Sequence, residues 1–410
     1  MARVLKNASW LTVSHLAGYA IPLIELPVLT RSLGPDAYGK LLFAQSLALS
    51  LSLIVEYGFN LSASRAVARN REDPVYLRKL FGSVILAKLL ITFFLLLFCI
   101  AWYLIQMPQL ANSDWGLAGA AAVFFLAFGF SPFWYFQGTE RMLGPVMLDL
   151  AFRFTGVILL YLFIHEPEDS VLALVILAVA GLCNTLITTG WALSRIGRPQ
   201  FELAGAWLQI CEGWHTFVYR SSSSVLLSAS PAVLGFSAGT LATGIFVPAE
   251  KLIRASTGLA LPVLTAFFPY LSRLSSAKDS RGNTHGWMLV GVLTLGGAIG
   301  AVLLWYLAPW LVLLLAGESF EASAGLMSLF VWLLPLRMLS QSLGLAILLP
   351  QGDERFAGYT MICSAILAVA LGVLFSGWYG AIGMVSALLV AEAMLVLLLL
   401  YRALRGRSQL

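Results

Sequence analysis

Charged side chains occur inside several long apolar stretches of this sequence. The basic ones are Lys88, Arg153, Arg220, Lys251, Arg254 and Arg337. The acidic ones are Glu25, Asp149, Glu250 and Glu392, with Glu56 near the end of such a stretch. A charge at the centre of a bilayer costs about 2.5–3.5 kcal/mol, so these groups should face a helix-bundle interior, a water-filled cavity or one another. Six bases against four acids favour a cavity that binds an anionic ligand.

Four of these charges have an opposite charge close by in the sequence. Asp149 and Arg153 are four residues apart. Glu250 and Arg254 repeat that spacing, which brings two side chains together on one face of a helix. We therefore expect two ion pairs, each within a single helix.

The remaining charges differ in their expected depth. Lys88 and Arg220 lie near the ends of apolar stretches, so their long side chains can extend to the membrane surface. Arg337 lies about 12 residues, or roughly 18 Å, from the nearer end of its stretch. Glu25 lies between Pro22 and Pro27, and prolines indicate a bent helix that lines a cavity.

The candidate site follows from this reasoning in two groups. The predicted substrate-binding residues of a cationic cavity are Arg153, Arg220, Lys251, Arg254 and Arg337. The predicted cavity or ion-coupling acids are Glu25, Asp149, Glu250 and Glu392. The hypothesis fails if Arg254 and Arg337 face acyl chains or are held in ion pairs that a ligand cannot reach.

The composition requires a membrane to position these residues. Of 410 residues, 60% are hydrophobic and 11% are charged, and the mean hydropathy is +0.87. Soluble domains are about 25% charged, so a water-soluble enzyme is excluded, and a disordered chain is excluded by the excess of apolar residues. The net charge of +5 is therefore interpreted by where the basic residues lie relative to the membrane, and we expect no nucleic-acid partner.

Twelve apolar stretches are long enough to cross a bilayer as helices. They are 9–30, 39–60, 81–104, 116–138, 144–164, 170–193, 215–234, 238–270, 287–307, 323–349, 357–376 and 379–401. With the N-terminus in the cytoplasm, seventeen Lys and Arg outside the spans lie on the cytoplasmic side, and two, Arg31 and Lys40, lie on the other. Basic loops stay in the cytoplasm, so the sequence predicts that both termini do.

Two pairs of short motifs indicate an internal repeat. Residues 34–39 (GPDAYG) match 239–244 (GTLATG), and residues 137–141 (QGTER) match 351–355 (QGDER). The offsets, 205 and 214, are close to half the chain length. We therefore predict an all-α membrane protein with two six-helix lobes that are parallel repeats: residues 1–194, a cytoplasmic linker at 195–214, and residues 215–410.

Other patterns predict packing, and common catalytic motifs are absent from the sequence. There is no GxxxxGK[ST] loop and no HExxH, and no cofactor or metal is predicted. Gly296 and Gly300 have a spacing that lets two helices approach closely. The aromatic string at residues 133–136 (FWYF) is typical of an interfacial belt, and its rings could alternatively stack on sugars.

Several motifs together resemble the polysaccharide-transporter family. They are LTRSLGPDAYGKLLFAQSL, EYGFNLSASRAVARN, FSPFWYFQGTERM and SFEASAGLMSLFVWLLPLRMLSQSLGLAILLPQGDERF. This family comprises Wzx-type flippases of lipid-linked O-antigen and related oligosaccharides, within the superfamily of multidrug, oligosaccharidyl-lipid and polysaccharide exporters.

The resemblance implies a function and a location. Such proteins move a polyprenyl (undecaprenyl)-pyrophosphate-linked oligosaccharide from the inner to the outer leaflet of the bacterial inner membrane. They act in surface polysaccharide (O-antigen or exopolysaccharide) biosynthesis, beside polysaccharide polymerases and glycosyltransferases. The driving force is left open between a coupling ion, Na⁺ or H⁺, and the membrane potential, which favours outward movement of anions.

Two other functions fit parts of the sequence less well. A cation-coupled multidrug exporter of the same superfamily should have a cavity rich in acids and aromatics, whereas bases are in excess here. A membrane-embedded polysaccharide polymerase or glycosyltransferase usually has a large outer loop with catalytic groups. The first predicted outer loop, Arg31 to Gly39, has one acid and is too short for an active site.

Overall fold

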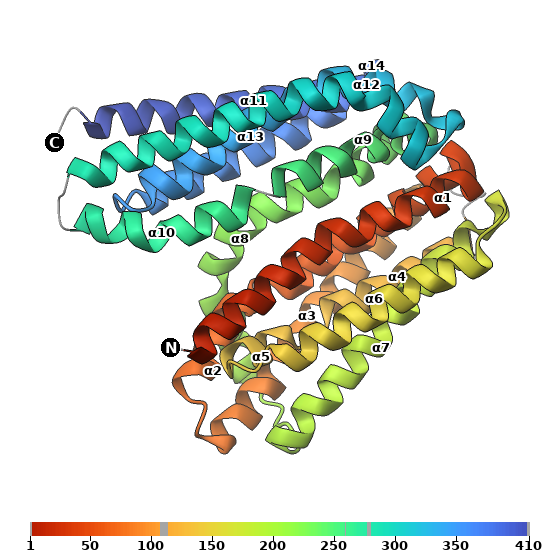
Figure 1. Cartoon of the computed structure of the whole chain (residues 1–410). Helices are drawn as coiled ribbons and strands as arrows, with labels where there is room; N and C mark the ends of the chain where they lie inside the picture. Colours follow the sequence, from red (N-terminus) through yellow and green to blue (C-terminus); the bar gives the residue numbers. More distant parts are fainter. Residues whose placement is uncertain (1, 107–113, 259, 277–279, 408–410) are drawn as a thin grey trace. The chain divides into compact units, whose positions relative to one another are not determined.

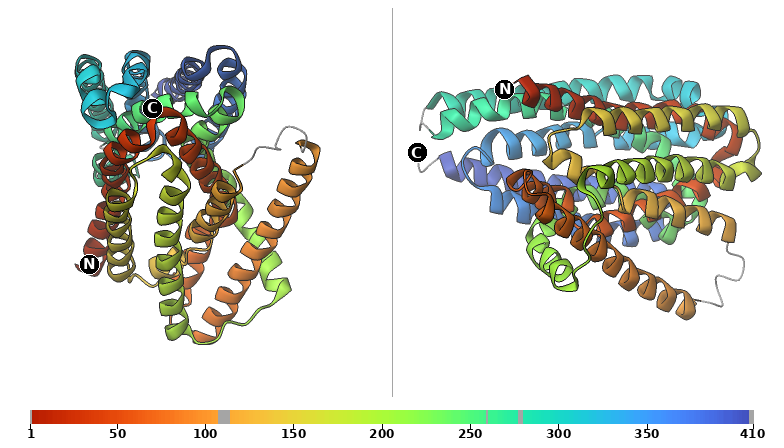
Figure 2. Two further views of the ribbon diagram at one scale, coloured as in Figure 1. Left: turned by 90° about the vertical axis from the view of Figure 1, so that its right-hand side faces the viewer. Right: turned by 90° about the horizontal axis from the view of Figure 1, so that it is seen from below.

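All described elements of the chain are helical (Figures 1 and 2). The computed structural model describes residues 2–106, 114–258, 260–276 and 280–407. It also describes the side chains at most of these positions, but not those of residues 215–228. The α-helices are α1 (Ala2–Glu56), α2 (Phe59–Arg69), α3 (Pro74–Gln106), α4 (Trp115–Gly129), α5 (Phe133–Gly138), α6 (Leu143–Phe163), α7 (Ser170–Ile196), α8 (Leu203–Ala238), α9 (Thr240–Gly258), α10 (Ala260–Ser276), α11 (Ser280–Ala316), α12 (Glu321–Phe330), α13 (Leu333–Ser342) and α14 (Glu354–Arg407). Short 3₁₀ turns lie at Pro167–Asp169 and Glu318–Phe320, and a π-helical turn, Leu343–Leu348, follows α13.

Among the described residues, seven helices are long and apolar enough to cross a membrane. An eighth is added if the bent pair Glu318–Phe330 and Leu333–Leu348, which are at 47° to each other, counts as one span. The all-helical, multi-span nature of the chain is therefore confirmed. The count of twelve spans and the cytoplasmic position of both termini stay predictions.

Two of the seven segments are too long for one straight span. Ala17–Arg69 has 53 residues and Glu354–Arg405 has 52, whereas about 20 helical residues cross the hydrocarbon core. The backbone leaves the helical region at Gly34 (φ 69°, ψ 175°) and at Gly380 (φ 56°, ψ −133°). Each segment therefore contains more than one helix, which explains part of the difference from the predicted count.

The described helices form two compact units. Unit 1 contains residues 1–17 and 44–229, and unit 2 contains residues 18–43 and 230–410. The middle part of α1, residues 18–43, thus packs with the C-terminal half of the chain. The predicted linker, 195–214, includes the end of α7 at Ile196 and the start of α8 at Leu203.

In unit 1, α7 packs along α4 and α6, and α2 packs on α5. The aromatic string of α5 is part of this core, because Trp134, Tyr135 and Phe136 are all buried. Its prediction as an interfacial belt is therefore wrong for these three rings. The rings of Phe81 and Trp134, at a centroid distance of 5.3 Å, join α3 to α5.

In unit 2, α13 packs against α11 and α14, and α9 packs against α12. The predicted close approach at the glycine-rich part of α11 is confirmed. A Cβ on Gly297 would lie 2.7 Å from Met338 Cγ, and one on Gly300 would lie 3.1 Å from Leu334 Cδ2. A Cβ on Gly296 would have no atom within 4 Å, so Gly297 and not Gly296 makes the close contact with α13.

The order of elements repeats along the chain. α4 is followed after a short break by α5, and α12 is followed after a short break by α13. The first Gln-Gly motif, residues 137–141, begins with the last two residues of α5. The second, residues 351–355, begins shortly after the π-helical turn that follows α13. A break in the helix thus lies near each motif, and the duplication into two six-helix lobes stays a prediction.

Candidate functional site

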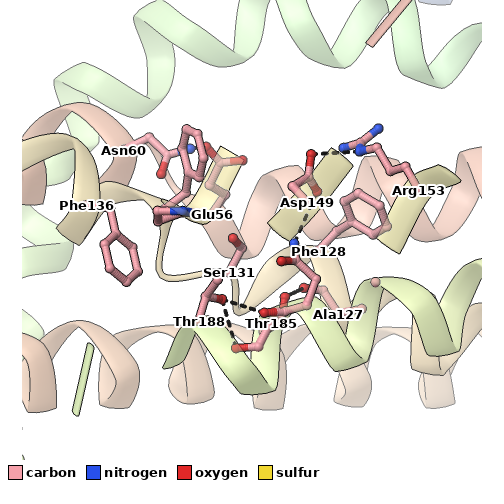
Figure 3. Close-up of a pocket in the computed structure, with 14 residues that line it drawn as sticks. Glu56, Asn60, Ala127, Phe128, Ser131, Phe136, Asp149, Arg153, Thr185 and Thr188 are labelled. Carbon is pink, nitrogen blue, oxygen red and sulfur yellow. Dashed lines mark hydrogen bonds and ion pairs between the residues drawn. The ribbon is translucent and has the colours of Figure 1, made fainter. Parts of the chain in front are cut away.

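Unit 1 contains a polar cavity of about 260 Å³ between α1, α2, α4, α5, α6 and α7 (Figure 3). We call it the Asp149 pocket. Its lining combines carboxylates, amides, hydroxyls and phenylalanine rings. The lining residues are Glu56, Asn60, Ala127, Phe128, Ser131, Phe133, Phe136, Pro145, Asp149, Arg153, Gly181, Asn184, Thr185 and Thr188.

Asp149 accepts hydrogen bonds on both carboxylate oxygens. Arg153 Nε donates to Oδ2 at 2.8 Å, and Asn184 Nδ2 donates to Oδ1 at 3.1 Å. The predicted ion pair between Asp149 and Arg153 is therefore confirmed, and the side chains are 24% and 36% exposed. The bond from Asn184 ties α7 to α6 across the pocket.

Lys88 lies beside this pocket rather than at a membrane surface. Its Nζ donates to the backbone oxygens of Gly129 at 2.9 Å and Ser131 at 3.2 Å, and the residue is 2% exposed. The prediction that Lys88 extends toward the surface is therefore wrong. The break between α4 and α5 leaves backbone carbonyls without helical partners, and the lysine satisfies two of them. Glu56 lies within electrostatic reach of its ammonium group.

Unit 2 contains six of the predicted charges. We call Glu25, Glu250, Lys251, Arg254, Arg337 and Glu392 the Arg337 cluster. The predicted pair of Glu250 and Arg254 is confirmed, with a hydrogen bond between Arg254 Nη2 and Glu250 Oε1. Lys251 approaches the carbonyl oxygen of Pro22 at 3.5 Å, and Glu25 lies within its electrostatic reach.

Arg337 and Glu392 are nearly buried and make a long ion pair. Arg337 Nε lies 3.7 Å from Glu392 Oε2, and the side chains are 12% and 14% exposed. That distance is beyond a good hydrogen bond. Glu392 accepts its hydrogen bond from the Ser340 hydroxyl instead. Among the described residues, Glu392 is the one ion-pair partner of Arg337, so the guanidinium keeps donors for a ligand.

Among the described side chains, the charges within the apolar stretches balance in each unit. Unit 1 has two such bases, Lys88 and Arg153, and two such acids, Glu56 and Asp149. Unit 2 has three such bases and three such acids: Lys251, Arg254 and Arg337, and Glu25, Glu250 and Glu392. The side chain of Arg220 lies outside the described residues, so the basic excess that the sequence predicts depends on that residue. A role for any of these residues in binding stays a prediction.

Sequence reasoning missed the uncharged polar residues of the Asp149 pocket. Asn184 and Thr188 are four residues apart on α7, and Thr185 and Gly181 lie on the same face. This polar face in an apolar helix is a signal at helical spacing that the search for charges passed over. Ser340, three residues after Arg337, was missed for the same reason.

Comparison with known proteins decides the family. Residues 4–275 match the polysaccharide biosynthesis protein family. The chain belongs to this family. It is 30% identical to a "Putative O-antigen transporter" from Shigella dysenteriae over 96% of this chain and 98% of the relative. It is 25% identical to a protein of the same name from Escherichia coli K12, over 96% of this chain and 95% of that one. The resemblance to polysaccharide transporters is thus confirmed.

Solved structures with low identity share the fold. The lipid II flippase MurJ, in an inward closed conformation, aligns with a TM-score of 0.69 at 14% identity, over 97% of this chain and 87% of that chain. An inward-facing multidrug resistance transporter of the MATE family aligns with a TM-score of 0.69 at 14% identity, over 96% and 94%. The chain therefore shares the all-helical, multi-span membrane fold of these two proteins. Its relatives at 25–30% identity are named as transporters and not as enzymes.

Proposed function

We propose that this chain is a flippase that moves a polyprenyl-pyrophosphate-linked oligosaccharide from the inner to the outer leaflet of the bacterial inner membrane. The observation that carries the proposal is the match, over nearly the full length of both proteins, to relatives named as O-antigen transporters. The translocated lipid-linked oligosaccharide is used in surface polysaccharide synthesis, in which polymerases and glycosyltransferases act on the same lipid-linked unit.

The physical task requires polar groups inside the membrane. A pyrophosphate and a sugar chain lose their hydration when they enter hydrocarbon, and desolvating one ion costs on the order of 20 kcal/mol in the idealised limit. Fixed polar groups of the protein can replace that water. Both units contain such groups: the Asp149 pocket in unit 1 and the Arg337 cluster in unit 2.

Within this proposal, Arg337 binds the pyrophosphate by exchange of partners. Its carboxylate neighbour is 3.7 Å away and already accepts a hydrogen bond from Ser340. A phosphate oxygen that offers direct, charge-assisted hydrogen bonds therefore competes well for the guanidinium. Arg254 is 30% exposed, so a ligand can reach it beside Glu250, and Arg220 and Lys251 complete the proposed set of cationic residues for the pyrophosphate. Arg153 lines the Asp149 pocket, where we propose that it contacts another part of the substrate.

We further propose twelve spans in two lobes that alternate access, with both termini in the cytoplasm. The membrane potential favours outward movement of an anion by about 2.3 kcal/mol per charge per 100 mV. Glu25, Asp149, Glu250 and Glu392 are the acids that could carry H⁺ or Na⁺ if an ion is exchanged.

Export of surface polysaccharide tests the proposal. A cell that lacks its own O-antigen transporter and produces the matching oligosaccharide should regain surface polysaccharide when this chain is expressed. The double variant Arg254→Ala/Arg337→Ala should lose export, while Arg402→Ala, which breaks an ion pair outside the Arg337 cluster, should keep it. Immunoblots must show equal amounts in the membrane. Wild-type export in the double variant would overturn the cationic-site proposal, and no export by the wild type would overturn the function.

One observation favours a second candidate function, export of cationic drugs. The Asp149 pocket is lined by two acids, one arginine and three phenylalanines, a composition that also suits an organic cation. Increased drug resistance on overexpression, lost in Asp149→Asn, would support this candidate. Unchanged resistance together with restored polysaccharide export would exclude it.

A further inference from the structure

We propose that the Asp149 pocket binds one neutral pyranose ring of the transported oligosaccharide. This inference rests on the proposed function and assigns the sugar part of the substrate to a place in unit 1. It concerns a site of different chemistry from the cationic residues of the Arg337 cluster. Size, charge and hydrogen-bonding capacity of the pocket each support it.

The size of the pocket suits a single small ring. Its volume of about 260 Å³ lies just below the range of roughly 300–1,000 Å³ that is typical for drug-sized ligands. A bare cation needs far less space, since its ligands lie at about 2–2.6 Å. Among the described residues there is also no group of three or more His, Cys, Asp or Glu side chains that could hold a metal ion.

The charges of the pocket favour a neutral ligand. Asp149 is paired with Arg153 at 2.8 Å, and Glu56 lies within electrostatic reach of Lys88 and accepts a hydrogen bond from Asn60. Both carboxylates are therefore already compensated. An anion would meet two carboxylates against one lining arginine, so the pyrophosphate is poorly suited to this pocket.

The hydrogen-bonding groups of the pocket are mainly free as acceptors. The Thr185 hydroxyl donates to Ala127 O at 2.6 Å, and the Thr188 hydroxyl donates to Asn184 O at 2.6 Å. Asn184 donates an amide hydrogen to Asp149, and its Oδ1 is a buried oxygen that has no hydrogen-bond partner within the described residues. Such a surface selects a ligand with several donors, and the hydroxyl groups of a sugar supply them.

Aromatic rings complete the fit to a sugar. Phe128 and Phe133 line the pocket and are only partly buried, so they can present surface to a ligand. The negative face of an aromatic ring attracts weakly positive hydrogens, such as the C–H groups on one face of a pyranose. The pocket therefore offers acceptors for the hydroxyls and ring surface for the apolar face of the same ligand.

Binding of free monosaccharides to the full chain in lipid nanodiscs tests the proposal. Saturation-transfer NMR would use glucose, galactose and N-acetylglucosamine as neutral probes, and glucuronate and inorganic pyrophosphate as anionic ones. At least one neutral sugar should give a signal, and a tenfold excess of pyrophosphate should leave it unchanged. No signal from any neutral sugar, or displacement by pyrophosphate, would overturn the proposal.

Matched variants locate the binding. Thr188→Val removes one oxygen from the pocket and should weaken sugar binding about threefold, whereas Asn184→Leu should weaken it at least tenfold. Thr155→Val is the control, because Thr155 on α6 makes the same bond to the fourth preceding carbonyl but is exposed outside the pocket. Equal binding in all variants would place the sugar elsewhere and overturn the proposal.

The outcome is separable from that of the proposed function. A chain that restores export but binds no neutral sugar would refute the sugar site alone. A chain that binds sugar in this pocket but never restores export would refute the flippase and leave the site.

Discussion

Gly39 and Gly244 make reciprocal backbone contacts in unit 2: Gly39 lies against the segment that begins at Thr240, and Gly244 lies against the segment that begins at Pro35. A Cβ on Gly39 would lie 1.9 Å from the carbonyl oxygen of Thr240, and a Cβ on Gly244 would lie 1.9 Å from that of Pro35. These are the two copies of the repeated motif, and equivalent residues make equivalent contacts. The Thr240 hydroxyl adds a hydrogen bond of 2.7 Å to Asp36. The two repeated motifs therefore contact each other, and each needs a glycine because the backbones approach too closely for a side chain.

Gly39→Ala and Gly244→Ala should each destabilise the protein, because backbone atoms occupy the space that the new methyl group needs. Such overpacking typically costs about 1–3 kcal/mol. Thermal unfolding of the purified variants in detergent measures the effect. Gly291→Ala on α11, which has nothing within 4 Å of the added Cβ, is the control and should not lose stability. Equal melting temperatures for all variants would show that the contact is absent.

Lys88→Met should destabilise unit 1, because it leaves the carbonyls of Gly129 and Ser131 without their donor. An unsatisfied buried polar group costs about 1–3 kcal/mol. The same substitution at Lys79, which is 49% exposed and paired with Glu202, should change stability by about 1 kcal/mol at most. Thermal unfolding compares the two. A variant Lys88→Met as stable as Lys79→Met would contradict the described bonds.

Glu392→Gln should strengthen the binding of inorganic pyrophosphate, because it removes the carboxylate that competes for Arg337. We expect an increase of several-fold in affinity, measured by calorimetry on the chain in nanodiscs, and loss of that binding in Arg337→Gln. Glu321→Gln, an exposed acid in the first turn of α12, serves as the control. If Glu392→Gln and Glu321→Gln bind pyrophosphate equally, partner exchange at Arg337 is wrong.

The predicted orientation can be tested with single cysteines in a variant without Cys99, Cys183, Cys211 and Cys363. Glu168→Cys, between α6 and α7, should react with a membrane-impermeant thiol reagent in intact cells. Glu354→Cys, at the start of α14, should react only after the membrane is opened. Both positions are exposed, so accessibility within the protein does not decide the result. The reverse pattern would invert the proposed topology.

The sequence by itself determined the membrane class, the repeated motifs and the ion pairs within single helices. Composition decides the first, and a spacing of four residues decides the last, as the pairs Asp149–Arg153 and Glu250–Arg254 show. These features depend on local geometry and on the cost of burying charge. The sequence therefore predicts that the charges are buried, but not which of them meet across helices.

Only the tertiary structure decided the contacts between distant residues. Lys88 reaches carbonyls at the break between α4 and α5, Glu392 on α14 lies beside Arg337 on α13, and Asn184 joins Asp149 across the pocket. Such contacts depend on the rotation and axial position of each helix. A helix that is apolar on all sides has no hydrophobic stripe to fix its rotation, so its sequence leaves the facing partners open until the helices are packed.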